Sequence, residues 1–91
     1  MFYTYVLLCK IKDNSKSIFY IGSTSDLRNR INEHKNKEVQ TTKKFASVEL
    51  VYYEACRNKA DSRKRELQLK TGFGRGYLKK RLDNDQVAEL V

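Results

Sequence analysis

Three short segments of the chain are dominated by aromatic and β-branched residues and are separated by polar turns. They cover residues 2–10, 17–22 and 47–54. This composition is typical of β-strands. Because the connection between the first two segments is short, we expect them to form an antiparallel hairpin. That pairing places Tyr5 and Tyr20 on neighbouring strands and lets their rings lie on the same side.

The first predicted strand is apolar on both faces and therefore reads as a buried strand. Side chains alternate between the two faces of a strand. One face carries two tyrosines, a leucine and a cysteine, and the other a threonine and two aliphatic residues. The two sets are Tyr3, Tyr5, Leu7 and Cys9 against Thr4, Val6 and Leu8.

A helix is predicted over about residues 26–35, because Leu27 and Ile31 lie one turn apart and form an apolar stripe. Arg30 and His34 lie beside that stripe. The candidates for the N-cap and first turn of this helix are polar: Ser23, Thr24, Ser25 and Asp26.

The second half of the chain predicts further helices. One begins at Asn58 or Asp61 and continues to about Lys70. Residues 36–44 are predicted to form an exposed loop, and residues 72–76 a glycine-rich interhelical turn. A third helix is predicted at residues 77–82 and a short terminal helix at residues 83–91.

The order of these elements is strand, strand, helix, strand, helix, helix. It predicts one domain over residues 1–91 with a mixed α/β composition, of the α+β class. The expected architecture is a three-stranded, mostly antiparallel sheet flanked by helices.

Cysteine usage and hydropathy narrow the class of protein. Cys9 and Cys56 fit no metal-ligand or redox spacing, so we expect buried free thiols in a reducing compartment. No apolar stretch approaches a membrane span, and the N-terminus lacks the regions of a signal peptide. We therefore expect a cytoplasmic protein.

Positive charge is concentrated in one part of the sequence. Residues 57–81 carry ten lysines and arginines against two acids, a balance of +8 that equals the formal net charge of the whole chain. Such a block attracts polyanions, and nucleic acid is the commonest polyanion in a cell. A solvated basic surface is the alternative.

The tripeptide Tyr20-Ile21-Gly22 is followed by Arg30 and His34, and Tyr5 lies upstream. A phenol, a guanidinium and an imidazole on a basic domain suggest chemistry on a phosphate. Each side chain also has a simpler interpretation: a core aromatic ring with a wet hydroxyl, a snorkelling arginine, and an ordinary surface histidine.

These motifs together resemble the GIY-YIG nuclease superfamily. Thr4-Tyr5-Val6 matches the first motif, Tyr20-Ile21-Gly22 the second, and residues 22–34 the helix that follows. Residues 63–70 look like the helix that carries the family's glutamate, here Glu66. The chain is most similar to small stand-alone bacterial members that resemble the N-terminal nuclease domain of the excision-repair subunit UvrC, which implies a place in DNA repair.

The resemblance implies hydrolysis of a nucleic-acid phosphodiester with one divalent metal ion, Mg²⁺ or Mn²⁺. Glu66 would be the sole protein ligand of the metal, and Arg30 would bind the phosphate. Tyr20 would orient or deprotonate the attacking water, supported by Tyr5. His34 lies one turn beyond Arg30 on the same face of the helix, so it could assist a proton transfer or hold the surroundings of Arg30. The catalytic residues implied are therefore Tyr5, Tyr20, Arg30, His34 and Glu66.

The role of Tyr20 requires a physical condition, and Glu66 has a simpler interpretation than metal binding. An ordinary phenol has a pKa near 10, so only about one in a thousand is ionised at pH 7. We therefore expect Tyr20 to lie within reach of Arg30 or the metal site. For Glu66, an ion pair with Lys70 or Arg63 on the helix surface is the simpler interpretation.

The basic segment is expected to bind DNA, with RNA as the alternative. Two other functions stay open: a non-catalytic nucleic-acid-binding module with the same fold, and a subunit that needs a protein partner for activity or targeting. The candidate contacts to the nucleic-acid backbone are Arg63, Lys64, Lys70, Arg75, Lys79 and Lys80.

Overall fold

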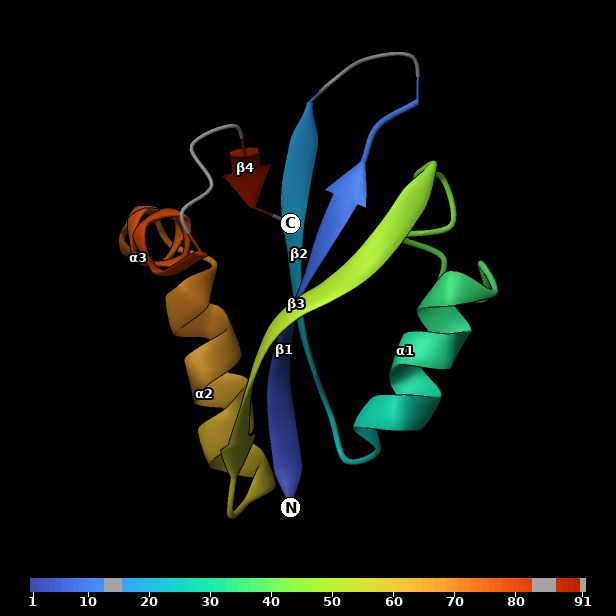
Figure 1. Ribbon diagram of the computed structural model, residues 1–91. Coiled ribbons are helices and arrows are strands. Elements are labelled where there is room, and N and C mark those ends of the chain that lie inside the picture. The colour runs from blue at the N-terminus through green and yellow to red at the C-terminus, as the bar shows by residue number, and fades with distance from the viewer. Residues whose placement is uncertain (13–15, 83–86, 91) are drawn as a thin grey trace.

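The computed structural model describes residues 1–12, 16–82 and 87–90. Within these residues the chain forms a four-stranded sheet with the strand order β3-β1-β2-β4 (Figure 1). The strands, in chain order, are β1 Phe2–Lys10, β2 Ser17–Thr24, β3 Ser47–Cys56 and β4 Val87–Leu90.

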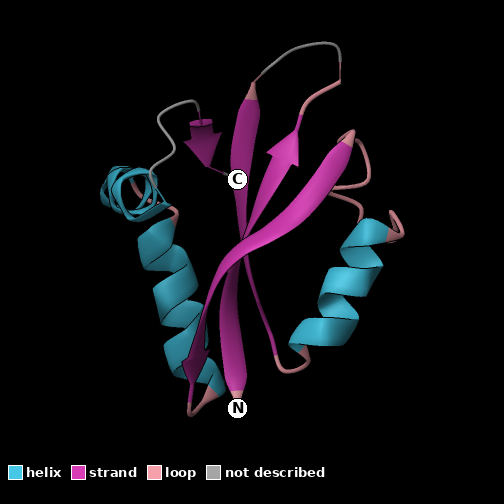
Figure 2. Cartoon of the chain, in the orientation of Figure 1, coloured by secondary structure: helices cyan, strands magenta, loops and turns pink. Residues whose placement is uncertain are grey.

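Three helices flank this sheet in the described part of the chain: α1 Leu27–Lys35, α2 Lys59–Leu69 and α3 Gly72–Leu82. Helix α1 lies on one side of the sheet, and α2 and α3 lie on the other (Figures 1 and 2). The β1–β2 and β1–β3 pairs are antiparallel. The predicted α+β class, the element order and the three-stranded antiparallel core are confirmed.

The predicted short helix over residues 83–91 is wrong where it can be checked. Residues 87–90 form β4, which pairs in parallel with β2 at Ser17 and Phe19. An unpaired strand edge offers backbone donors and acceptors, and these outweigh local helical preference over so short a segment. Residues 83–86 and 91 lie outside the described residues, as does the predicted turn at 13–15.

The alternation in β1 divides the interior into two clusters, as the sequence predicts. On the α1 side, Tyr5, Leu7 and Cys9 pack with Ile31. On the α2 and α3 side, Val6 is joined by β2 and helix residues. That second cluster comprises Val6, Phe19, Ile21, Leu69 and Leu78. β1 is therefore covered on both faces.

The structure identifies the N-cap residues of α1 and α2 among the predicted candidates. The N-cap of α1 is Asp26, whose carboxylate accepts a bond from Asn29 N at 3.1 Å. This placement leaves Ser23 outside the helix, where it makes a contact described below. Asn58, one of the two predicted starts, caps α2 by accepting from Asp61 N at 2.8 Å.

The glycine-rich segment 72–76 is helical, which contradicts the predicted interhelical turn. Helix α3 begins at Gly72, and the hydroxyl of Thr71 accepts a bond from Gly74 N at 3.2 Å. A Cβ at Gly74 would collide with the backbone of Leu69. The glycine therefore permits the sharp α2–α3 junction without ending the helix.

Two further expectations need correction. The polar segment 36–44 is not simply an exposed loop, because Val39 and Thr42 are buried. Both cysteines are free thiols, but only Cys9 is buried, and Cys56 is partly exposed at the end of β3. Among the described residues, none of the helices has the length and apolarity needed to cross a membrane.

Candidate active site

The hydroxyl of Tyr5 lies over a glycine on the neighbouring strand. Tyr5 pairs with Gly22 in the antiparallel β1–β2 register. A Cβ built on Gly22 would lie 2.5 Å from the Tyr5 hydroxyl oxygen and 2.6 Å from Cζ. Only a residue without a side chain therefore lets the Tyr5 ring cross β2 toward its outer edge.

Arg30 reaches the same hydroxyl from α1. Its Nε donates to the Tyr5 oxygen at 3.4 Å, and its Nη1 forms an ion pair with Glu33 at 3.0 Å. The bond to Tyr5 and the pair with Glu33 raise the pKa of Arg30. The guanidinium is therefore a fixed positive charge, held by a phenol and a carboxylate and about one-third exposed.

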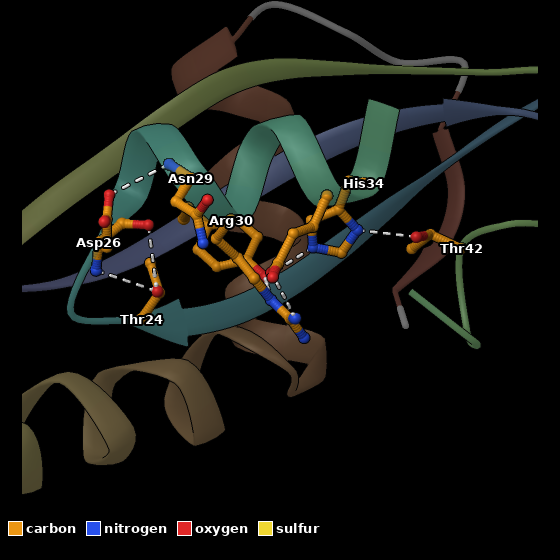
Figure 3. Close-up of polar contacts among 8 residues, drawn as sticks. Thr24, Asp26, Asn29, Arg30, His34 and Thr42 are labelled. Carbon is orange, nitrogen blue, oxygen red and sulfur yellow. Dashed lines mark hydrogen bonds and ion pairs between the residues drawn. The ribbon is translucent and has the colours of Figure 1, made fainter. Parts of the chain in front are cut away.

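His34 is buried against Tyr5 and is not the surface histidine that the sequence left open. Its Nε2 lies 2.8 Å from the Tyr5 hydroxyl, and its Nδ1 lies 2.7 Å from the hydroxyl of Thr42. Figure 3 shows Arg30 and His34 leaving the same side of α1, with Thr42 on the far side of the imidazole. The helix delivers both groups to one place because they are one turn apart.

Tyr20 completes an aromatic cluster with these residues. Its ring centroid lies 6.3 Å from that of Tyr5 and 5.1 Å from that of His34. Unlike Tyr5 it is partly exposed. The prediction that the two tyrosine rings share one side of the sheet is confirmed. Tyr20 therefore lies beside the group that holds Arg30, rather than facing away from it.

Burial keeps the centre of this cluster neutral. It raises the pKa of Tyr5 to about 12, although the bond from Arg30 acts in the opposite direction. Burial and the nearby charge of Arg30 lower the pKa of His34 to about 4. At neutral pH the site therefore holds a protonated phenol next to a neutral imidazole that can accept a proton.

Glu66 approaches the cluster from the other face of the sheet. Its Oε1 accepts from the Ser23 hydroxyl at 2.8 Å and pairs with Arg63 at 2.9 Å, and its Oε2 pairs with Lys70 at 2.9 Å. Burial alone would raise the pKa of Glu66, but the bonds from Lys70, Arg63 and Ser23 hold it below its usual range. The carboxylate is buried and ionised.

The two halves of the site meet at the edge of β2. Gly22 admits Tyr5 on one face, and the next residue, Ser23, binds Glu66 on the other. The charge of Glu66 is close enough to contribute to the raised pKa of Tyr5. The structure gives Glu66 no direct bond to Arg30 or the aromatic rings, so the five predicted residues form two adjoining groups rather than one.

The candidate nucleic-acid contacts divide in the same way. Arg63 and Lys70 lie against Glu66, whereas Lys64 is exposed on α2. The others lie on α3, where Lys79 is partly buried and Arg75 and Lys80 are exposed. The basic segment therefore presents its cations along α2 and α3, beside the carboxylate.

Sequence reasoning missed two residues of the site. Thr42 lies in a polar run that suggests solvent, but its neighbours Val39 and Phe45 are buried at three-residue intervals. That spacing could have indicated an inward-facing turn. The sequence predicts Ser23 among the caps of α1, although strand alternation places it with Ile21 on the α2 face.

Glu66 fits a divalent-metal site of the single-carboxylate kind. It supplies an ionised, hard oxygen, and Mg²⁺ commonly keeps several waters when one or two carboxylates hold it. No group of three or more histidine, cysteine, aspartate or glutamate side chains in the described residues could form an all-protein cage. A bound ion would take the place of Lys70 or Arg63 beside a Glu66 oxygen.

Comparison with known proteins agrees with this geometry. The family model for the GIY-YIG catalytic domain matches residues 1–81. A UPF0213 protein of Staphylococcus saprophyticus is 37% identical over 68 residues, which cover 74% of this chain and 79% of the relative. A UPF0213 protein of Staphylococcus haemolyticus is 38% identical over 68 residues, with the same coverage. No solved structure matches the chain.

Proposed function

Because this chain belongs to the GIY-YIG catalytic domain family, a family of nucleases, we propose that it is a metal-dependent endonuclease that hydrolyses phosphodiester bonds in DNA. One observation carries the proposal. The Tyr5 hydroxyl is bonded at once to Arg30 and to His34, at the edge of β2 where Glu66 arrives from the other face. This arrangement brings a fixed cation, a proton acceptor and an ionised carboxylate to one edge.

The protein's own groups divide the work of hydrolysis. Arg30 binds the scissile phosphate and stabilises the charge that develops on its oxygens. Tyr20, the accessible phenol, orients the attacking water. A divalent ion held by Glu66, Mg²⁺ or Mn²⁺, would supply electrostatic stabilisation of the leaving oxygen.

Tyr5 is a proton carrier and not a preformed base. With a pKa of about 12, only about one Tyr5 in 100,000 is ionised at pH 7. Because Tyr5 is 1% exposed, it meets no bulk water in the free protein, so a water oriented by Tyr20 beside the bound phosphate would have to reach it. Tyr5 can take a proton from that water only as it gives its own proton to Nε2 of His34 at 2.8 Å. One O–H bond of water and the Tyr5 O–H break while a new phenol O–H and the His34 N–H form. The hydroxide attacks phosphorus, the bond from phosphorus to the leaving ester oxygen breaks, and that oxygen takes up a proton from solvent.

A non-catalytic nucleic-acid-binding module is the second candidate. It is favoured by the contacts of Glu66, since Arg63, Lys70 and Ser23 already engage both carboxylate oxygens. In that case the carboxylate would only hold two basic side chains in place. Cleavage assays separate this candidate from the first.

The test is a panel of labelled duplex, branched and single-stranded DNA and single-stranded RNA, with Mg²⁺, Mn²⁺ or EDTA. Arg30→Ala and Glu66→Gln should each lower the cleavage rate by about 100-fold or more, the magnitude typical of a lost electrostatic stabiliser. Matched controls are Arg28→Ala, an exposed neighbour on α1, and Glu38→Gln, an exposed acid.

The binding measurements give the other half of the test. Both active-site variants should bind DNA nearly as well as the parent protein, since most of the basic surface is intact. If the parent protein binds nucleic acid but cleaves none of the substrates with either metal, the enzyme proposal fails and the binding module stands.

A further inference from the structure

The loop that follows α1 places a hydroxyl against the far side of the His34 imidazole. We propose that Thr42 is a positioning residue that holds His34 in the tautomer with its proton on Nδ1, so that Nε2 is free to accept the proton of Tyr5. The effect of this tautomer on catalysis rests on the proposed nuclease function. The tautomer itself is independent of that function.

The hydrogen bonds around Tyr5 select this tautomer. Arg30 has no lone pair to offer, so in the contact at 3.4 Å its Nε donates and the Tyr5 oxygen accepts. The proton of the neutral phenol therefore needs another acceptor, and Nε2 of His34 lies 2.8 Å away. With Nε2 accepting, the ring proton of a neutral imidazole is on Nδ1, which donates to Thr42 at 2.7 Å.

Water is excluded from both contacts, which makes Thr42 the stable partner of Nδ1. Tyr5, His34 and Thr42 are each 1% exposed. A small pocket of about 230 Å³ borders His34 and Thr42 on the outer side. A side chain that left this corner empty would let water in, whereas one of the same shape would not.

The backbone fixes the orientation of Thr42. Its N–H donates to Val39 O at 3.1 Å, and its carbonyl accepts from Phe45 N at 3.1 Å. Val39 and Phe45 are themselves buried, so their side chains anchor the turn on both sides of Thr42. The hydroxyl is therefore held toward the imidazole before any substrate is present.

The surrounding charges favour a neutral ring. Arg30 repels a proton on His34, and Glu33, on the same helix, attracts one more weakly. The Tyr5 and Tyr20 rings pack edge-on against the imidazole from β1 and β2. Lys35 and Lys37 line the pocket behind it. A proton accepted at Nε2 is therefore transient, as a relay requires.

The test compares three substitutions at one position. Thr42→Val keeps the shape and removes the hydroxyl, Thr42→Ser keeps the hydroxyl, and Thr42→Ala opens the corner to water. The tautomer is read from the ¹⁵N shifts of His34, the chain's single histidine. We expect Nδ1–H in the parent protein and in Thr42→Ser, and a substantial Nε2–H population in Thr42→Val.

Kinetics provide the second readout. Thr42→Val should lower kcat by about 10- to 100-fold, the range for lost partners that orient an imidazole, with little change in KM. Thr42→Ser should restore kcat to within about 3-fold of the parent, and Thr42→Ala should lie between the two if water replaces the hydroxyl. The expected order of kcat values follows from the fraction of His34 in the wrong tautomer, which also lowers the activity of other catalytic histidines.

Two outcomes overturn the proposal: an Nε2–H tautomer in the parent protein, or ¹⁵N shifts in Thr42→Val that match the parent. Should Thr42→Val fail to fold, Thr42→Ser decides, because an Nε2–H tautomer in a variant that keeps the hydroxyl also overturns the proposal. Failure of the nuclease proposal would abolish the kinetic readout and leave the spectra unchanged, so the two failures are distinguishable.

Discussion

The two faces of the sheet both supply side chains to the site at the edge of β2, but they hold these side chains in different ways. On the α1 face, Tyr5 and His34 are neutral and buried, and a hydrogen bond and an edge-on ring contact join them. On the α2 face, Glu66 is ionised and is held by Lys70 and Arg63, whose side chains are 36% and 59% exposed. The first face depends on packing and protonation, whereas the second depends on charge. Conditions that disturb one should therefore leave the other largely intact.

Acid should disturb the α1 face first. The pKa of His34 is about 4 in the folded protein against 6.5 ordinarily, so the unfolded chain binds more protons between these values. The free energy of unfolding should therefore fall as pH drops from 6.5, by roughly 3 kcal/mol near pH 4. Denaturant unfolding curves measured across this range give the value.

His34→Gln is the control for the acid experiment, since glutamine does not titrate. The carboxyls of Glu54 and Glu66 have lowered pKa values, and their contribution is lost only below their ordinary 4.5. Above that pH the slope belongs to His34. Parallel curves for the parent protein and His34→Gln would contradict a neutral, buried imidazole.

Filling the space above Gly22 should disturb packing on the same face. Gly22→Ala places a methyl group 2.5 Å from the Tyr5 hydroxyl, and the buried ring has little room to move. We expect a loss of about 1–3 kcal/mol of stability, as for other overpacked cores, together with lost cleavage. Thermal denaturation and a cleavage assay measure both effects.

Gly76→Ala provides a matched substitution on the other side of the sheet, in α3. A Cβ there meets nothing within 4 Å, and the residue lies inside α3. Alanine should therefore be neutral or add up to about 1 kcal/mol, because it is the better helix former. Equal losses at Gly22 and Gly76 would mean that the tyrosine contact is unimportant.

Salt should act mainly on the α2 face, where most of the candidate phosphate contacts lie. If about five phosphates are neutralised, log affinity for duplex DNA should fall with log salt at a slope of about −4.5. Lys64→Gln and Lys80→Gln should each reduce that slope by about 0.9, whereas Lys12→Gln, an exposed cation on the hairpin, should not. Fluorescence anisotropy at several salt concentrations measures the slopes, and a flat response would exclude nucleic acid as the partner.

The sequence predicts the parts of this fold that depend on local pattern. Alternation in β1 gives both interior clusters, and the β1–β2 hairpin gives the pairing that brings Tyr5 beside Tyr20. The apolar stripe and polar residues before it locate α1 to within a residue. These features are predictable because each follows from neighbours a few positions away.

The parts that the sequence does not predict depend on contacts between distant segments. Thr42 looks like a solvent residue until the turn packs against α1, and residues 87–90 look helical until the edge of β2 pairs with them. The helical start at Gly72 depends on how closely α3 approaches Leu69. For the site, the resemblance to the nuclease family indicates Glu66 but not that Ser23 joins it to β2.

The two cations on Glu66 have a consequence for ligand order. Lys70 and Arg63 compensate a desolvated anion, yet both are long side chains that a phosphate could draw away. A phosphate that attracted one of them would expose the carboxylate to a replacement cation, and a metal that bound the carboxylate would release Lys70 or Arg63 toward the polyanion. Metal and DNA should therefore bind with positive cooperativity, each raising the affinity for the other by the same factor.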